Sequence, residues 1–169
     1  IGDVLAISAG EEFTCALMKN KEVWCWGKNN LGQLNDGTTT NSSKPMKSTV
    51  EKSPIEISGG QGSLLANSMS AVGQWSKEQS ELVKEINTSL SISANRWATG
   101  GCAVTLGGEV KCWSKDLLSS KIADTLASLL VSVGLKHGCA INEDQTVSCW
   151  GANADGELGN GGNTDSDSA

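Results

Sequence analysis

Residues 15–26, C-A-L-M-K-N-K-E-V-W-C-W, decide the fold because their pattern occurs three times with the same spacing between its cysteines. Residues 102–113 read C-A-V-T-L-G-G-E-V-K-C-W, and residues 139–150 read C-A-I-N-E-D-Q-T-V-S-C-W. Each copy runs from Cys-Ala and an aliphatic residue through a turn to Val and a closing Cys-Trp. Two short apolar runs on either side of turn residues predict a β-hairpin. The sequence therefore predicts three equivalent hairpins.

The spacing of the cysteines predicts how they pair. If the copies reverse at Asn20, Gly107 and Asp144, the two cysteines of each copy lie directly opposite each other. Opposed residues of an antiparallel pair have Cα atoms roughly 4.5 to 5.5 Å apart, a distance that a disulfide accepts. Six cysteines alone allow about fifteen pairings, and the repeat selects one of them. We predict the disulfides Cys15–Cys25, Cys102–Cys112 and Cys139–Cys149.

Length and charge limit the class of protein. A chain of 169 residues can bury one core, and a formal net charge of −6 argues against nucleic acid as a partner. No apolar run approaches the eighteen or so residues that span a bilayer, so we expect no transmembrane segment. Three disulfides point to an oxidising compartment, and the start at Ile1 rather than Met fits a processed product. The expected localisation is extracellular or at the cell surface.

Four apolar runs, at 5–10, 55–60, 91–95 and 130–134, stand in front of the hairpins. Each predicts an inner strand, which gives three consecutive strands per unit at a period of roughly 37 to 50 residues, typical of propeller blades. We predict a single repeat domain, 1–169, with units at 1–54, 55–90, 91–129 and 130–169, the last of them truncated. The second unit carries Leu65 and Gln74 at its cysteine positions, so its hairpin is expected to lack a disulfide.

Two segments predict helices where a blade would have a loop and a fourth strand. In 76–90, Ser76 and Gln79 resemble a capping box, and apolar residues recur at helical spacing. In 115–130 a comparable apolar stripe runs through the segment. The two stripes are Leu82, Val83, Ile86 and Leu90, and then Leu118, Ile122, Leu126 and Leu129 or Leu130.

The pattern I-S-A-G-x-x-F-T-C-A-L, followed by V-W-C-W-G-x-N-x-x-G-Q-L-x-D-G-T, resembles the repeat of the RCC1-like (regulator of chromosome condensation) superfamily. It is similar to the Cys-containing form found in secreted bacterial proteins, and the match covers 5–45, 130–162 and part of 92–114. The resemblance implies a propeller, usually of seven blades. The expected fold is therefore mainly β: disulfide-stapled, propeller-blade-like hairpin repeats in four units, an incomplete or open array, with two helical inserts. Open ends leave apolar faces and strand edges bare, which favours assembly.

No set of residues in the sequence suits catalysis. The only histidine, His137, occupies the place of Phe13 in the first copy, which favours packing. Zinc prefers cysteine pairs two to four residues apart with His partners, which this chain lacks. We expect no catalytic residue, no metal and no cofactor, and a protein that is not an enzyme. Calcium at 153–167 stays open as an alternative, although the segment lacks EF-hand spacing and the repeat explains its Asn and Gly as loop residues.

The six tryptophans divide by position. Trp26, Trp113 and Trp150 share one place in the repeat, after the second cysteine, and are expected in the core. Trp24 and Trp97 do not share it, so they are our candidates for binding, since exposed Trp is enriched at binding hot spots.

These observations favour a secreted or surface-displayed scaffold that acts through contacts with other protein chains, including copies of itself. It would be a subunit of an extracellular assembly or filament, or an adhesion or display module. The alternative is a proteinaceous inhibitor of an extracellular hydrolase, which the resemblance implies for a secreted member of the superfamily, with Trp24 and Glu22 as contact candidates. Nucleotide exchange on a small GTPase, a third hypothesis, conflicts with the predicted disulfides.

Overall fold

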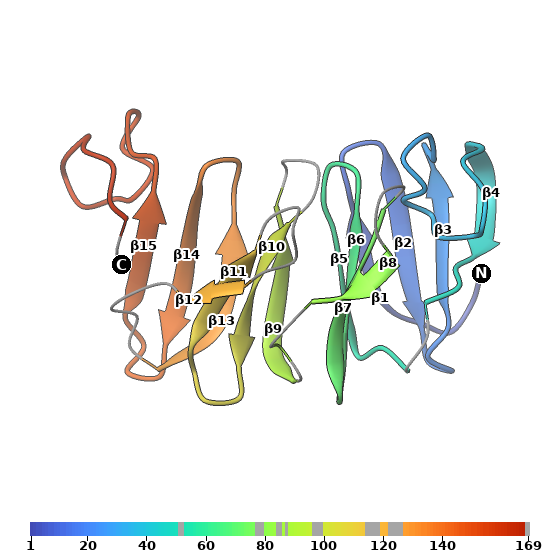
Figure 1. The fold of residues 1–169 in the computed structure, drawn as a ribbon, viewed down its shortest axis with the longest axis horizontal. Coiled ribbons are helices and arrows are strands. Elements are labelled where there is room, and N and C mark those ends of the chain that lie inside the picture. The colour runs from blue at the N-terminus through green and yellow to red at the C-terminus, as the bar shows by residue number, and fades with distance from the viewer. Residues whose placement is uncertain are drawn as a thin grey trace.

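The computed structural model describes residues 1–50, 53–76, 80–83, 86, 88–95, 100–113, 119–121 and 127–167. Within these residues the chain forms four antiparallel sheets that stand side by side in a row (Figure 1). Each sheet takes its strands in sequence order, so every blade is a simple meander. We number the sheets blades 1 to 4 from the N-terminus. Among the described residues no helix is long and apolar enough to cross a bilayer.

The blades have the following strands. Blade 1 contains β1 (Val4–Ala9), β2 (Phe13–Met18), β3 (Val23–Gly27) and β4 (Ser42–Lys47). Blade 2 contains β5 (Glu56–Gly59), β6 (Leu64–Ser68), β7 (Ala71–Trp75) and β8 (Ser80–Leu82). Blade 3 contains β9 (Ser89–Ala94), β10 (Gly101–Thr105), β11 (Val110–Trp113) and β12 (Ser119–Lys121). Blade 4 contains β13 (Ser128–Val133), β14 (His137–Asn142) and β15 (Val147–Gly151).

The hairpins have the register that the sequence predicts. Cys15 lies opposite Cys25, and the cysteines of blades 3 and 4 are paired in the same way. All three predicted disulfides are present, with Cα atoms 4.0 to 4.1 Å apart, and no described cysteine is free. Three disulfides are typical of proteins from an oxidising compartment.

The hairpin of blade 2 also forms, without a disulfide. Leu65 lies opposite Gln74 in the register that the cysteines occupy elsewhere, and both side chains are fully buried. The inner strands β1, β5, β9 and β13 confirm the four predicted lead-in runs.

The prediction of two helical inserts was wrong. Within 76–90 the chain forms β8 and enters β9, and the backbone of Val83 and Ile86 is hydrogen bonded to Val72 of β7. Within 115–130 it forms β12 and enters β13, where Leu129 and Leu130 are exposed. The edges of β7 and β11 need hydrogen-bond partners, and pairing with a fourth strand satisfies them, so tertiary context overrides the helical spacing. Leu118, Ile122 and Leu126 lie outside the described residues.

The core is divided into three clusters, one at each junction between neighbouring blades. Leu17 and Val23 of blade 1 pack with Ile57 and Leu64 of blade 2. Blades 2 and 3 meet through Leu65, Val72, Ile92 and Trp113, and blades 3 and 4 through Val104, Val110, Val131 and Trp150. Because each sheet is too thin to bury its own side chains, the stability of the array comes from these junctions.

Two long loops, one in blade 1 and one in blade 4, have the same pattern of hydrogen bonds. In the first, the Asn29 side chain donates to Asp36 Oδ1 (3.1 Å) and Thr38 O (3.1 Å) and accepts from the Leu34 backbone N–H (2.9 Å). Burial opposes ionisation of Asp36, but the hydrogen bonds from Thr38 and Asn29 outweigh it and hold the pKa of Asp36 below its usual value. Asn29 is thus the centre of the loop.

The second loop repeats this network in blade 4. Asn153 donates to Asn160 Oδ1 and Gly162 O and accepts from the Leu158 N–H. The loop places Ser166 in an antiparallel β-bridge with Gly151, just as the first loop places Ser42 opposite Gly27.

A glycine begins each of these loops for a steric reason. Gly27 and Gly151 have φ of 112° and 104°, and a Cβ at either would lie 2.6 Å or less from a carbonyl oxygen of the neighbouring turn. Only glycine fits that backbone. Blades 2 and 3 have serine at this place, Ser76 and Ser114, and continue into β8 and β12 instead.

Replacing Asn29 with Ala should lower the free energy of unfolding by about 2–3 kcal/mol, because it leaves the buried Leu34 N–H and the Thr38 carbonyl without their partner. The neighbouring Asn30 is exposed, so Asn30→Ala should change stability by less than about 0.5 kcal/mol. Denaturant unfolding of both variants measures the difference. Equal values for the two would show that the network does not stabilise the loop.

Candidate protein interface at the two ends of the blade array

Each blade has two different faces because side chains alternate along a strand. One face, which we call the cysteine face, carries the disulfide, or Leu65 and Gln74 in blade 2. The opposite face, which we call the tryptophan face, carries the Trp that follows the second cysteine position. These two faces have different surfaces, so the blades can stack in only one direction.

At every junction the cysteine face of one blade meets the tryptophan face of the next. Trp75 of blade 2 packs against the cluster that contains Cys15 and Cys25, and Trp150 of blade 4 shares a cluster with Cys102. At the middle junction, where the disulfide is missing, the Trp113 indole N–H donates to Gln74 Oε1 at 2.7 Å. Gln74 therefore replaces the sulfur contact with a hydrogen bond.

A second interaction recurs at the same junctions. A serine on the cysteine face accepts a hydrogen bond from a backbone N–H of the next inner strand. The three bonds are Gly59 N to Ser8 Oγ (2.9 Å), Ala94 N to Ser58 Oγ (2.9 Å) and Val133 N to Ser93 Oγ (3.0 Å). Glu56 adds a bond from the Ile92 N–H, and burial raises the pKa of this carboxyl. Polar groups thus fix the register between blades.

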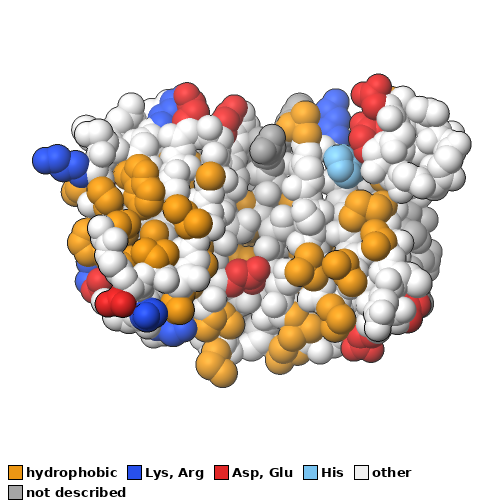
Figure 2. Space-filling view, turned by 180° about the vertical axis from the view of Figure 1, so that it is seen from behind, with side chains coloured by type: hydrophobic (Ala, Val, Ile, Leu, Met, Phe, Trp, Pro, Cys, Tyr) orange, Lys and Arg blue, Asp and Glu red, His pale blue; other side chains and the backbone are white. Residues whose placement is uncertain are grey.

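The two ends of the array leave one face of each kind uncovered (Figure 1). The tryptophan face of blade 1 comprises Ile7, Ala9, Thr14, Ala16, Trp24 and Trp26. The cysteine face of blade 4 comprises Leu130, Ser132, Cys139, Ile141, Val147 and Cys149. Figure 2 shows hydrophobic side chains gathered in two groups, one toward each end of the same side of the molecule.

Trp24, a candidate from the sequence, lies on the uncovered face of blade 1. It is half-buried, and its indole N–H donates to Glu22 Oε2 at 3.2 Å. Lys47 forms an ion pair with the same carboxylate, and the hydrogen bonds from Lys47 and Trp24 lower the pKa of Glu22. Trp97, the other candidate, lies outside the described residues.

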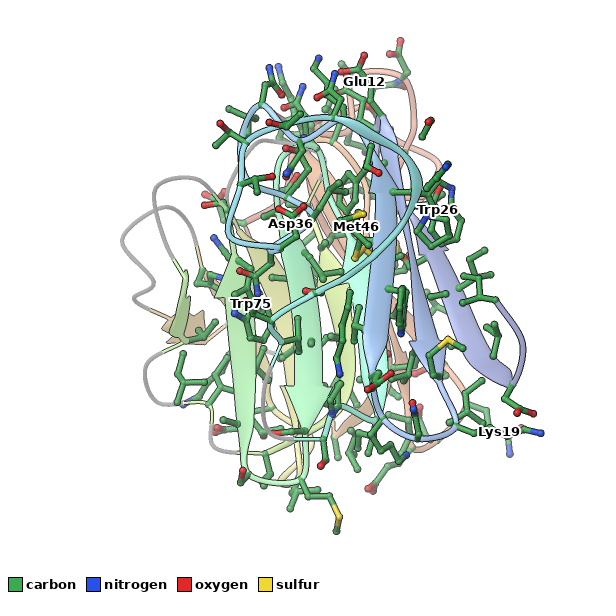
Figure 3. The ribbon with its side chains drawn as sticks, turned by 90° about the vertical axis from the view of Figure 1, so that its right-hand side faces the viewer. Glu12, Lys19, Trp26, Asp36, Met46 and Trp75 are labelled. Carbon is green, nitrogen blue, oxygen red and sulfur yellow. A yellow bond between two sulfur atoms is a disulfide. The ribbon has the colours of Figure 1, made fainter. Side chains whose placement is uncertain are left out.

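Trp26 projects on the side of blade 1 that faces away from blade 2, whereas Trp75 comes from β7 of blade 2 (Figure 3). Trp113 and Trp150, at the same place in the repeat, are buried as predicted, while Trp26 is only partly buried. The difference follows from position, because Trp26 has no preceding blade to cover it.

The remaining sequence candidates lie in structural positions. His137 begins β14 as Phe13 begins β2, in agreement with their shared place in the repeat. In the loop considered for calcium, Asn160 Oδ1 and Asp165 Oδ1 accept hydrogen bonds from Asn153, as their counterparts do in the first loop. Protein groups thus account for the loop conformation. Among the residues the structure describes, no three His, Cys, Asp or Glu side chains cluster in a way that could hold a metal.

Comparison with known repeats identifies the architecture. The regulator of chromosome condensation (RCC1) repeat matches residues 4–33 and 130–157 in one form and residues 21–66 in another, together more than half of the chain. The chain belongs to the RCC1 repeat family. The RCC1 repeats in these ranges include the hairpins of blades 1 and 4, where the Trp-Gly pair is intact, the Asn29 loop and the start of the Asn153 loop.

Several RCC1 repeat and RCC1-like proteins are similar over most of this chain. The Ultraviolet-B receptor UVR8 of Arabidopsis thaliana is 28% identical over an aligned length of 195 residues, covering 96% of this chain and 44% of the receptor. Human WBSCR16 superposes with a TM-score of 0.83 at 18% identity, covering 99% of this chain and 52% of that protein. Yeast RCC1 (Prp20), in a crystal structure with Kap60, gives 0.79 at 13% identity, covering 98% and 47%. The chain thus spans about half the length of these relatives.

Sequence reasoning did not find the apolar residues that dominate the uncovered faces, Ile7, Ile141 and Val147. They look like ordinary strand residues, and their counterparts at internal junctions are buried. Aligning the RCC1 repeats would have placed them at junction positions, and only the absence of a neighbouring blade exposes them.

Blade 2 offers a test of the hairpin register. In the double variant Leu65→Cys/Gln74→Cys a fourth disulfide should form, because these residues are opposed as the cysteine pairs are. The cross-link should add roughly 2–3 kcal/mol of stability, largely offset by the loss of the buried leucine and of the Trp113 hydrogen bond.

A thiol count on the unfolded, non-reduced double variant measures the outcome and should be zero. The single variant Leu65→Cys, with one free thiol, is the control. Two free thiols in the double variant would contradict the register.

Proposed function

We propose that this RCC1 repeat chain is a non-enzymatic scaffold, secreted or displayed at the cell surface, that serves as a subunit of an extracellular assembly. It acts through protein contacts made by its two uncovered blade faces. The observation that carries the proposal is the pair of apolar end faces. Contiguous exposed apolar surface on a folded protein marks an interaction site.

The composition of the end faces supports contact with protein. Ile7, Trp24 and Trp26 on one face, and Ile141 and Val147 on the other, are aliphatic and aromatic side chains of the kind that anchor interfaces. Full burial of each such aliphatic side chain contributes about 1.5–3 kcal/mol.

The disulfides support an extracellular setting. The three cross-links persist where thiols are oxidised, and two of them pack at junctions within the array. A scaffold outside the cell gains resistance to unfolding from them. We place the chain with the secreted, Cys-containing members of the RCC1 repeat family.

Light scattering on the native, non-reduced chain should give a mass above 17.5 kDa that falls on dilution. Val147→Glu should weaken this association by at least about tenfold, because a buried charge disfavours an apolar contact. Leu106→Glu is the matched control, since Leu106 and Val147 are both 64% exposed and Leu106 lies on a hairpin turn. A single 17.5 kDa species over a roughly hundredfold concentration range would overturn the assembly.

A second candidate function is inhibition of an extracellular hydrolase. The ordered group of Trp24, Glu22 and Lys47 favours it, because a fixed aromatic ring beside charged groups suits insertion into a partner's cleft. A panel of secreted hydrolases tests this candidate. Inhibition that is lost in Trp24→Ala and kept in Leu106→Glu supports it, and a panel without any inhibited enzyme removes it.

A further inference from the structure

The loop that follows β15 contains the only Asn-Gly pair of the sequence, Asn160-Gly161, and projects from the molecule beyond blade 4 (Figure 1). In such a pair the glycine nitrogen and the asparagine side-chain carbon Cγ can close a five-membered ring, because glycine has no side chain to obstruct the approach. Asn160 and Gly161 are both exposed, and a Cβ placed on Gly161 would meet no atom within 4 Å. The fold therefore leaves room for the ring.

The side-chain oxygen of Asn160 is held by two hydrogen-bond donors. The Gly162 N–H donates to Asn160 Oδ1 at 3.0 Å, and Asn153 Nδ2 donates to it at 3.2 Å. Attack on Cγ places negative charge on this oxygen, and donors already in position stabilise such a charge. Among the described residues, neither the Gly161 N–H nor the Asn160 amide nitrogen donates a hydrogen bond. The attacking and leaving nitrogens are thus unrestrained, while the oxygen is fixed.

The loop that follows β3 in blade 1 has an aspartate, Asp36, at the place of Asn160. Asp36 Oδ1 accepts from Asn29 Nδ2 at 3.1 Å and from the Thr38 N–H at 2.9 Å, the same two donors by position. Although burial opposes its ionisation, the hydrogen bonds from Thr38 and Asn29 hold the pKa of Asp36 below its usual value. This arrangement of donors therefore accepts an ionised aspartate.

Two other positions of these loops exchange an amide for an acid and keep the same hydrogen bond. Gln33 of blade 1 corresponds to Glu157 of blade 4, and each accepts a bond at 2.9 Å from the backbone N–H two residues earlier. Asn41 corresponds to Asp165, and their Oδ1 atoms accept from the backbone N–H of the central asparagine at 2.8 and 2.9 Å. The network uses the side-chain oxygen at each position, so it tolerates either residue type.

We propose that Asn160 is a site of spontaneous deamidation, and that its loop directs the product toward aspartate. The Gly161 nitrogen gives its proton to water, forms a bond to Asn160 Cγ and displaces ammonia, which leaves a cyclic imide. One water molecule then opens the imide. Cleavage of the new Cγ–N bond yields aspartate, whereas cleavage of the original peptide bond yields isoaspartate, in which the main chain runs through the side chain.

The loop favours aspartate because that product keeps the original backbone and the two donors to the side-chain oxygen. Isoaspartate would add a methylene group to the main chain between Asn153, the centre of the network, and Ser166, which forms the bridge to Gly151. Conversion to aspartate adds one negative charge to an exposed loop, where water screens it. Deamidation would thus give the blade 4 loop the acid that the blade 1 loop already has.

The experiment follows the full, non-reduced chain during incubation at neutral pH, with proteolysis and mass spectrometry at intervals. A synthetic peptide of residues 157–166 is the unstructured reference. In the folded chain Asn160 should convert at no less than about one tenth of the peptide rate, and the ratio of aspartate to isoaspartate should be at least about threefold higher. The exposed residues Asn30 and Asn163, which precede Leu31 and Thr164, are internal controls and should stay unchanged.

Slower conversion than one tenth of the peptide rate would show that the fold protects Asn160, and would overturn the proposal. A product ratio equal to that of the peptide would overturn the directing role of the loop. Retained circular dichroism throughout the incubation would show that the folded chain was measured.

Three variants assign the reaction to this pair. Gly161→Ala should slow conversion at least about tenfold, because the added Cβ lies beside the attacking nitrogen. Since alanine is strained at the φ of 81° that Gly161 adopts, Asn160→Gln is the second variant, and it should not convert because its ring would need six members. Asn160→Asp, the proposed product, should unfold at the denaturant concentration of the wild type.

A gain of the same mass in Asn160→Gln would place the reaction at another residue and overturn the site. Unfolding of Asn160→Asp at a clearly lower denaturant concentration than the wild type would show that this network does not accept the acid, and would overturn the directed product.

Discussion

The antiparallel register of the second and third strands is the constraint on which the rest of the structure depends. It sets Cys15 opposite Cys25 on one face and turns Trp26 to the other face, because neighbouring side chains alternate. The same register recurs in blades 3 and 4. Every such blade therefore has a disulfide on one side and a tryptophan on the other, which fixes the direction in which blades stack.

Blade 2 shows which part of this arrangement is essential. It has lost both cysteines, yet Leu65 and Gln74 keep the register, fill the junction and supply an acceptor to the Trp113 indole. The junction thus depends on a filled, hydrogen-bonded surface rather than on sulfur itself. The serine-to-backbone bonds, which are independent of the disulfide, are present at all three junctions that the structure describes.

In a repeat protein, neighbouring repeats are joined by interfaces of one recurring kind. The contacts that join blades 1 to 4 are the contacts that an uncovered blade offers to a partner, so folding and association draw on one set of side chains. Because the same side chains serve folding and association, a chain can act as a scaffold through ordinary strand residues. Ile7 and Val147 are exposed in this structure, whereas their counterparts Val131 and Val110 are buried in the core.

The sequence by itself determined the hairpins, the three disulfides, the inner strands and the missing cross-link of blade 2. These features depend on spacings within about a dozen residues, where strand register is local. The prediction was wrong for the segments that follow the hairpins of blades 2 and 3. Leu82, Val83 and Ile86 have helical spacing, whereas the strand edge at β7 offered hydrogen bonds that a helix would leave unmade. Only the tertiary structure decided that Trp26, Ile7 and Ile141 lie uncovered at the two ends, since exposure depends on which neighbours are present, and spacing along the chain does not encode that.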